Sequence, residues 1–523
     1  TVWVLGFDNK FAPMFNSGIA RFNSALKPDS VMFENKNIPK NDNSFVFTLA
    51  RRANLDKQDI FISIGNKYAV DGLIRKLPHY GKYSYLAFSA DEPTNIAKGQ
   101  WPVVNSPLVK VLSDSGSKVS MIEPREALAS LKPVFSENRM MASIKYLASD
   151  KLKGRGLGSP ELELAADYIS SEFKSAGLQP VNDDYFQELT RNFDGKGELK
   201  LKNIIGIIPG IDPELKDEVV VLSAHYDHLG LGWPDHHAGD EGKIHPGADD
   251  NASGVAIMLE LARSLAKTAK PARTIVFLAA SGEEAGLIGS RYFVQNAEKE
   301  FGWKFFADVN LDTDGSLFDK KLMVLNANTA KEWKFIFMGT DYTTGVLSEV
   351  VENDLDASDQ LAFIEKGIPA VQLFAGATMN YHRPGDRYDA IDGKGLLKVA
   401  TVAKEVILYL ADREDPMLFT GKNASVRPAA VKKSQGRRVS TGTVPDFAFK
   451  GEGVKVGSVI PGSAGEKAGL MAGDIISKLD GVDAKDLRTY SILLKNYQPG
   501  DQVVLTVLRN GEEETINLVL GER

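Results

Sequence analysis

The residues best suited to chemistry lie within positions 219–254. His225 and Asp227 follow an apolar, strand-like run and are two residues apart, so an extended chain places both side chains on the same side. Asp249 and Asp250 come later, directly before a turn-forming group that opens a long apolar run. Imidazoles and carboxylates gathered at strand ends outside an open sheet are what a hydrolytic zinc centre requires.

More groups of this kind follow other apolar runs of the same region. Glu283 and Glu284 are adjacent at the end of one run, Asp312 ends the next, and Tyr381 and His382 come after a third. Side chains of adjacent residues need not point the same way, so one glutamate can ligate a metal while the other faces the substrate as a base. Several such groups at strand ends of one domain indicate a single site.

The elements that must position these groups are buried strands separated by helices. Short apolar runs predict strands, and periodic apolar positions predict helices that cover them. Ser159 and Gly177 have the residue types that begin and end one of these helices. The predicted strands are at 203–210, 219–225, 274–281, 308–312, 322–326 and 370–374, and further helices at 253–268, 286–300, 359–367 and 394–411. The pattern predicts an α/β sandwich with a mostly parallel core.

A chain of 523 residues is too long for one hydrophobic core, which suggests about three domains. We expect a small α/β domain at 1–120, a central domain at 133–413, a basic linker at 414–440 and a β-rich domain at 441–523 with a hairpin at Asn510 and Gly511. Residues 92–108 are predicted to be a connector.

The net charge of −7 gives no support to a nucleic-acid partner. Cysteine is absent, so a metal would be held by His, Asp and Glu. No apolar run reaches the roughly 20 residues that span a bilayer. The sequence begins at Thr1 without methionine, so we expect that a preceding segment has been removed.

Six motifs carry a resemblance to a known family. HYDHLG, GADDNASG, SGEEAGLIGS, NLDTDG, SDQLAFIEKGIPA and YHRPGDRYD, in this order, resemble the co-catalytic zinc aminopeptidases of peptidase family M28, the secreted bacterial leucine-type enzymes. Relatives of that family include glutamate carboxypeptidases and glutaminyl cyclases. The resemblance covers about residues 135–412 and implies a phosphorylase/hydrolase-like α/β sandwich with a mixed, mostly parallel sheet.

The resemblance also implies roles for the site residues. One zinc is expected to bind His225 and Asp312, and the other Glu284 and His382, with Asp250 as the bridge. Three further roles are implied. Glu283 is the expected general base and acid, Asp227 orients His225, and Tyr381 holds the substrate carbonyl or its oxyanion. Asp386 is a candidate partner for His382.

Some positions leave alternatives. Asp314 stands where the family usually has an apolar residue and could ligate in place of Asp312, and Asp249 lies beside the expected bridge. Gln360 occupies a position that is often His or Tyr in the family. The other histidines near the site are predicted to be loop or pocket-rim residues: His228, His236, His237 and His245.

The C-terminal region resembles a PDZ domain of the bacterial protease-associated type, on the motif PGSAGEKAGLMAGDIISKLDG. Such a module binds an extended peptide by strand addition, with backbone amides holding a terminal carboxylate. The expected peptide loop is at 447–449 and lacks the familiar Gly-Leu-Gly-Phe. A packing domain that binds no peptide is the alternative.

The combined hypothesis is a zinc-dependent exopeptidase that removes N-terminal residues from peptides. The PDZ module would recruit substrates or partners, or restrain the active site. A carboxypeptidase or a glutaminyl cyclase on the same scaffold is one alternative, and a non-catalytic peptide-binding protein is another. The resemblance suggests a bacterial periplasmic, cell-envelope or secreted location.

Overall fold

The computed structural model describes residues 2–33, 36–51, 54–102, 126–193, 195–353, 358–421, 438–447, 449 and 451–522. The chain divides into two compact units, residues 1–125 and 126–523. Most of the predicted basic linker, residues 422–437, lies outside the described residues. A search of the described residues finds no helix with the length and apolar character needed to cross a membrane.

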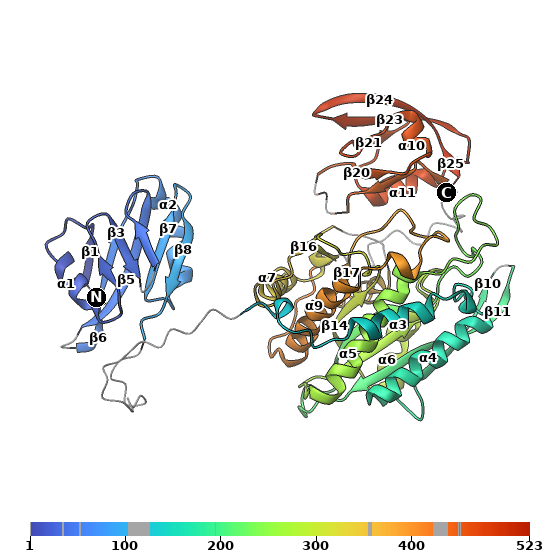
Figure 1. Cartoon of the computed structure of the whole chain (residues 1–523), viewed down its shortest axis with the longest axis horizontal. Helices are drawn as coiled ribbons and strands as arrows, with labels where there is room; N and C mark the ends of the chain where they lie inside the picture. Colours follow the sequence, from blue (N-terminus) through green and yellow to red (C-terminus); the bar gives the residue numbers. More distant parts are fainter. Residues whose placement is uncertain are drawn as a thin grey trace. The chain divides into compact units, whose positions relative to one another are not determined.

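The first unit is a small α/β unit with a mixed sheet (Figure 1). Strand β1 pairs with β6 in parallel, and the remaining pairs of this sheet are antiparallel. The sheet order is β1-β6-β5-β7-β8, with β1 Val2–Leu5, β5 Asn43–Arg51, β6 Asn54–Ser63, β7 Tyr85–Ser89 and β8 Thr94–Gly99. The helices are α1 Ala12–Ala20 and α2 Ala69–Lys76, and a separate three-stranded sheet contains β2 Ala25–Leu26, β3 Ser30–Phe33 and β4 Lys36–Pro39.

One prediction for this unit was wrong. Residues 94–99 were expected in a connector, but they form the edge strand β8. None of the residues of β8 is fully buried, so the segment lacks the apolar pattern that marks a strand in the sequence.

The second unit is built around a nine-stranded mixed sheet. Its four central strands, in the order β13-β12-β14-β17, are all parallel, whereas antiparallel pairs join β11 and β15 to them. The strands are β9 Gln179–Pro180, β10 Phe186–Phe193, β11 Gly197–Ile208, β12 Glu218–His225, β13 Ile275–Ala280, β14 Lys304–Leu311, β15 Leu322–Leu325, β16 Ser348–Val350 and β17 Ala370–Phe374. The prediction of a mixed sheet with a parallel core is confirmed.

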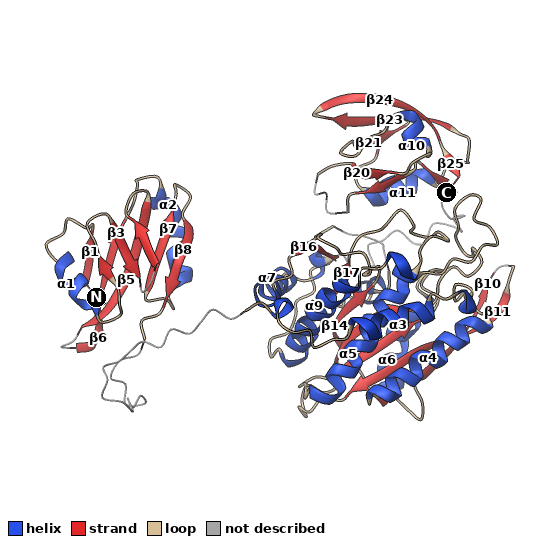
Figure 2. Ribbon diagram, in the orientation of Figure 1, coloured by secondary structure: helices blue, strands red, loops and turns tan. Residues whose placement is uncertain are grey.

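Helices cover both faces of this sheet (Figure 2). Alternate residues of β12 face opposite layers: Val220 and Leu222 join the core under α3, α4, α5 and α9, whereas Val219 and Val221 join the core under α6 and α8. The helices are α3 Glu137–Leu147, α4 Pro160–Ala176, α5 Gly254–Thr268, α6 Ile288–Phe301, α7 Glu332–Thr344, α8 Gln360–Ile364 and α9 Gly393–Asp412. Ser159 caps α4 and Gly177 ends it at a φ of +93°, as predicted.

The C-terminal region forms a six-stranded antiparallel sheet with two short helices. The sheet order is β19-β20-β21-β23-β24, with β22 paired to β21. Asn510 and Gly511 form the predicted hairpin turn between β23 and β24. The elements are β18 Val439–Ser440, β19 Thr443–Pro445, β20 Val454–Val459, α10 Ala464–Ala468, β21 Ile475–Leu479, β22 Val482–Asp483, α11 Leu487–Leu494, β23 Gln502–Arg509, β24 Glu512–Val519 and β25 Gly521–Glu522.

A buried arginine joins the two ends of the long connection between β12 and α5. Arg155 has no exposed surface, and its guanidinium donates hydrogen bonds to four main-chain carbonyls. Two of these belong to Pro246 and Gly247, at 2.7 and 3.0 Å, and one to Tyr226, at 2.9 Å. Burial lowers the pKa of Arg155 to about 10, which leaves it charged at neutral pH. Arg155 therefore fixes the loop after β12 against the loop before α5.

Replacing Arg155 with methionine should destabilise the second unit. The change leaves buried carbonyls without donors, at a cost of roughly 1–3 kcal/mol each, so we expect the free energy of unfolding to fall by about 3–5 kcal/mol. Denaturant titration of the full chain measures this change. The matched control is Arg387→Met, because the Arg387 side chain is 49% exposed and pairs with an exposed aspartate. Equal stability of the two variants would contradict the role given to Arg155.

Candidate metal centre

The carboxyl ends of the four parallel strands meet at one edge of the sheet, and the predicted site residues lie there. Each residue of β12 after Glu218 is buried, as expected for a central strand, and His225 is its last residue. Asp312 directly follows β14, and His382 lies in the loop after β17. Parallel strands thus deliver side chains from distant parts of the chain to one place.

The loop after β13 carries the two glutamates. Gly282 has a φ of +76°, a conformation that favours glycine, and it turns the chain sharply after the strand. The Asp227 carboxylate accepts hydrogen bonds from the main-chain N–H groups of Gly282 and Glu283, at 2.7 and 3.2 Å. Asp227 therefore fixes the loop from which Glu283 and Glu284 project.

Asp250 lies between two histidines. Its Oδ1 is 3.2 Å from Nε2 of His225, and its Oδ2 is 3.2 Å from Nε2 of His382. Nε2 of His225 is also 3.4 Å from Oδ1 of Asp312, and Nε2 of His382 is 3.3 Å from Oε2 of Glu284. The two oxygens of one carboxylate thus face two separate groups of ligand atoms.

These spacings fit tetrahedral zinc. Bonds from zinc to nitrogen or oxygen are about 2.0–2.2 Å, so two ligands of one tetrahedral ion lie about 3.3 Å apart. The four distances around Asp250 are all between 3.2 and 3.4 Å. Oε1 of Glu284 is buried, with Nδ1 of His228 2.7 Å away, and bound cations would neutralise the surplus of carboxylates. The donor set therefore fits a pair of metal ions that share Asp250.

Both histidines have an anchored second nitrogen. Nδ1 of His225 lies 3.1 Å from the main-chain oxygen of Asp227, and Nδ1 of His382 lies 3.0 Å from the carboxylate of Asp235. These contacts leave Nε2 of each ring directed at Asp250. Asp227 thus positions His225 through its backbone rather than its side chain. Asp386 does not contact His382, because its carboxylate accepts the N–H groups of Asp249 and Asp250 instead.

The structure places His228 inside the centre, whereas the sequence predicted it to be a loop or pocket-rim residue. It has no exposed surface, and its Nδ1 is 2.7 Å from Oε1 of Glu284 and 3.8 Å from Oδ1 of Asp250. Ligand atoms of these three residues lie within 4.8 Å of one another, so His228 is a second candidate for the nitrogen ligand beside Glu284. The 2.7 Å spacing is shorter than that between two ligands of one zinc, which favours His382 as the ligand.

The electrostatics of the centre follow from the crowding of carboxylates. Burial raises the pKa of Glu283 well above its ordinary range, and Glu284, Asp359 and Asp312 raise it further against the opposing effect of His225. Burial also raises the pKa of Asp250, but His228, His225 and His382 outweigh it and hold that pKa well below the ordinary range. Asp250 is therefore suited to stay ionised between the two histidines.

Tyr381 lies at the edge of the centre. Its ring stacks on His382 with the ring centroids 4.0 Å apart and remains 38% exposed. An accessible hydroxyl beside the metal ligands can reach a bound substrate.

The alternative ligands point elsewhere. Asp249 accepts the N–H of Gly315 at 2.6 Å and so lies against that loop. Asp314 is fully buried, and neither of its carboxylate oxygens has a hydrogen-bond partner, but it belongs to neither group of candidate ligands, in contrast to Asp312. Gln360 is buried and donates to the side-chain oxygens of Asn326 and Gln372, at 3.0 and 3.1 Å.

The sequence did not predict the roles of Arg155 and Asp235, which form hydrogen bonds at the centre. It also did not predict that His228 is buried there. Arg155 lies between two glycines, which is a turn signal but no sign of its function. Asp235 follows Trp-Pro in the histidine-containing loop, and nothing in its spacing points to His382.

Comparison with known proteins shows similarity to two domain families. The sequence profile of peptidase family M28 matches residues 203–407, and the profile of the PDZ domain matches residues 426–520. A probable zinc metalloprotease of Pyricularia oryzae is 31% identical over 212 residues, which are 38% of this chain and 38% of that protein. Aminopeptidase YwaD of Bacillus subtilis is 25% identical over 257 residues, 46% of this chain and 49% of that protein. The chain thus spans less than half of the length of these relatives.

Solved structures with related architecture include LapB of Legionella pneumophila and a glutaminyl cyclase of Porphyromonas gingivalis. LapB has a TM-score of 0.44 and 20% identity, covering 53% of this chain and 73% of that one. The cyclase has a TM-score of 0.41 and 21% identity, covering 52% and 98%. The two sequence profiles identify the domains: the chain carries a metallopeptidase domain of family M28 followed by a PDZ domain.

Proposed function

We propose that the chain is a two-zinc aminopeptidase that hydrolyses the first peptide bond of peptides with a free N-terminus. The observation that carries the proposal is the position of Asp250, whose two oxygens are each 3.2 Å from Nε2 of a different histidine. One zinc would bind His225 and Asp312, the other Glu284 and His382, and Asp250 would bridge them. Bound there, zinc would polarise the scissile carbonyl and lower the pKa of a water towards about 7.

The chain's own groups would handle the proton. Glu283 is not among the proposed ligands but is adjacent to one of them, so its free carboxylate would take a proton from the attacking water and pass it to the leaving amine. Tyr381 would donate a hydrogen bond from its hydroxyl to the developing oxyanion. Asp227 is a positioning residue, since it anchors His225 through its carbonyl and the Glu283 loop through its carboxylate.

The surroundings of the centre favour an aminopeptidase over a carboxypeptidase, because a carboxypeptidase needs a cation to hold the C-terminal carboxylate of its substrate. Arg155, the buried cation beside the centre, already donates to four carbonyls and has no exposed surface for a substrate carboxylate. The name of the Bacillus subtilis relative, aminopeptidase YwaD, supports the same choice.

The PDZ domain would bind peptides through β19, the outermost strand of its sheet. We propose that the loop before this strand, residues 440–442, holds the C-terminal carboxylate. This differs from the loop expected at 447–449, because Phe447 packs against Phe374 of the peptidase domain and Ala448 lies outside the described residues. We further propose the domain boundaries 133–413 and 441–523, and a cell-envelope or secreted location.

Zinc content distinguishes the two candidate histidines. His382→Ala should retain one zinc per chain instead of two after dialysis, because it removes a direct ligand. His228→Ala should still bind two zinc ions when zinc is in excess, with the second bound about 10–100-fold more weakly, because His228 only supports Glu284. Elemental analysis and zinc titration measure both. Loss of one zinc from His228→Ala but not from His382→Ala would reverse the assignment.

The proposed activity is tested with aminoacyl anilides that have free or acetylated amino groups. We expect hydrolysis of only the free-amine substrates, loss of activity after chelation and recovery with zinc. Hydrolysis of acetylated substrates, or of substrates that present only a free carboxylate, would contradict an aminopeptidase. Cyclisation of N-terminal glutamine without peptide hydrolysis would favour a glutaminyl cyclase.

Glu283→Gln is the control for chemistry in the same assay. The variant should keep both zinc ions but lose at least about a thousandfold in kcat, because general acid and base catalysis is removed at both proton transfers. A rate near that of the wild type with both metals bound would remove Glu283 from the mechanism.

A further inference from the structure

The PDZ sheet has an open edge that runs toward the peptidase domain. Among the described residues, strand β19 pairs with β20 on one side only, and it is the last strand of the sheet order. Helix α11 lies beside both ends of this strand: Tyr490 donates to Thr441 just before β19, at 3.2 Å, and Leu487 packs in one cluster with Phe447 just after it. An extended peptide can therefore lie between β19 and α11.

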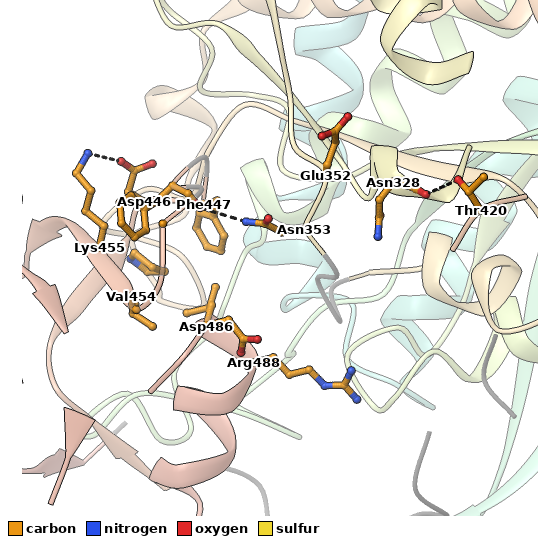
Figure 3. A pocket seen from close by; sticks show the side chains of 15 residues that line it. Asn328, Glu352, Asn353, Thr420, Asp446, Phe447, Val454, Lys455, Asp486 and Arg488 are labelled. Carbon is orange, nitrogen blue, oxygen red and sulfur yellow. Dashed lines mark hydrogen bonds and ion pairs between the residues drawn. The ribbon is translucent and has the colours of Figure 1, made fainter. Parts of the chain in front are cut away.

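A pocket of about 420 Å³ continues this groove beyond Pro445 (Figure 3). Its PDZ walls are the start of α11, at Asp486 and Leu487, and the hairpin loop that carries Phe447 and Phe449. Its volume lies in the range of sites that bind small ligands or a few residues of a peptide.

The peptidase domain supplies the opposite wall. Asn328, Glu352, Asn353 and Thr420 line the same pocket. Two contacts fix the wall in place. Nδ2 of Asn353 donates to the main-chain oxygen of Phe449 at 3.1 Å, and the rings of Phe374 and Phe447 meet edge to face at 5.3 Å. The pocket thus exists only where the two domains meet.

We propose that this pocket binds the upstream residues of a peptide whose free C-terminus lies at the start of β19. The peptidase domain would then form half of the ligand site of the PDZ domain. This inference rests on the proposed peptide binding by β19, but not on the proposed aminopeptidase activity. Because strand residues advance by about 3.3 Å each, the last four residues of the ligand cover β19 and the residues before them reach the pocket.

The charges of the walls define the ligand further. Three carboxylates and two cations line the pocket. Asp446 is paired with Lys455 at 3.0 Å, and the exposed carboxylates of Glu352 and Asp486, one from each domain, outnumber Arg488. Asp486 also accepts the N–H of Thr489 at the start of α11. A lysine or arginine four to six residues before the C-terminus would lie near both exposed carboxylates. The ligand class is therefore an extended C-terminal peptide with upstream basic residues.

The contact also links the ligand to the metal centre. Phe374 is the last residue of β17, and the loop that follows it carries Tyr381 and His382. A peptide that displaces Phe447 would thus act on the base of the loop that holds a proposed zinc ligand.

Binding of three peptide pools to the full chain tests the proposal. Each pool is capped with fluorescein at the N-terminus, which an aminopeptidase cannot remove, and has a free carboxylate and four randomised C-terminal residues. One pool has Gly-Lys-Lys-Gly upstream, the second Gly-Glu-Glu-Gly, and the third no upstream residues. Fluorescence anisotropy should show the lysine pool binding at least tenfold more tightly than the other two.

Glu352→Lys should remove the advantage of the lysine pool and leave the short pool unaffected. Glu214→Lys makes the same charge change at an exposed site elsewhere on the peptidase domain and should have no effect. The proposal is overturned if the lysine pool binds no more tightly than the short pool, or if Glu352→Lys leaves its advantage intact. Absence of binding by every pool would overturn both this proposal and peptide binding by β19, while anilide hydrolysis reports separately on the aminopeptidase.

Discussion

Repulsion among buried carboxylates is the constraint on which the rest of this structure depends. Asp227, Asp250 and Asp386 are each no more than 3% exposed, and Asp312 is 8% exposed. Such a cluster is unfavourable unless each group is neutralised, hydrogen-bonded or bound to a metal. Three features of the fold stabilise these carboxylates: histidines on both sides of Asp250, the buried guanidinium of Arg155, and main-chain N–H groups that donate hydrogen bonds to the carboxylates.

Two carboxylates outside the proposed ligand set hold the loops of the centre in place. Asp227 binds the N–H groups of the Glu283 loop, and Asp386 binds those of Asp249 and Asp250. Arg155 connects the two ends of the loop between β12 and α5 through the carbonyls of Tyr226, Pro246 and Gly247. The ligands are thus held by groups that are themselves fixed to the backbone, which restricts the movement of the ligands.

The sequence predicted the central strands and the groups at their ends, because strands buried on both faces are continuous apolar runs. It did not predict the anchors of the histidines. Asp235 and His382 are 147 residues apart, and Arg155 binds main-chain oxygens, which leave no mark in the sequence. The edge strand β8 was missed because its mixed, partly exposed residues carry no alternation. His228 was predicted to be on the rim because its burial depends on packing between distant loops.

The central claim is that Asp250 bridges two zinc ions, one beside His225 and one beside His382. A crystal structure of the zinc-loaded chain, with anomalous scattering recorded at the zinc edge, tests it most directly. The account predicts two anomalous peaks about 3.5–4 Å apart, with one oxygen of Asp250 on each. A single peak, or two peaks of which one lacks contact with Asp250, would contradict it.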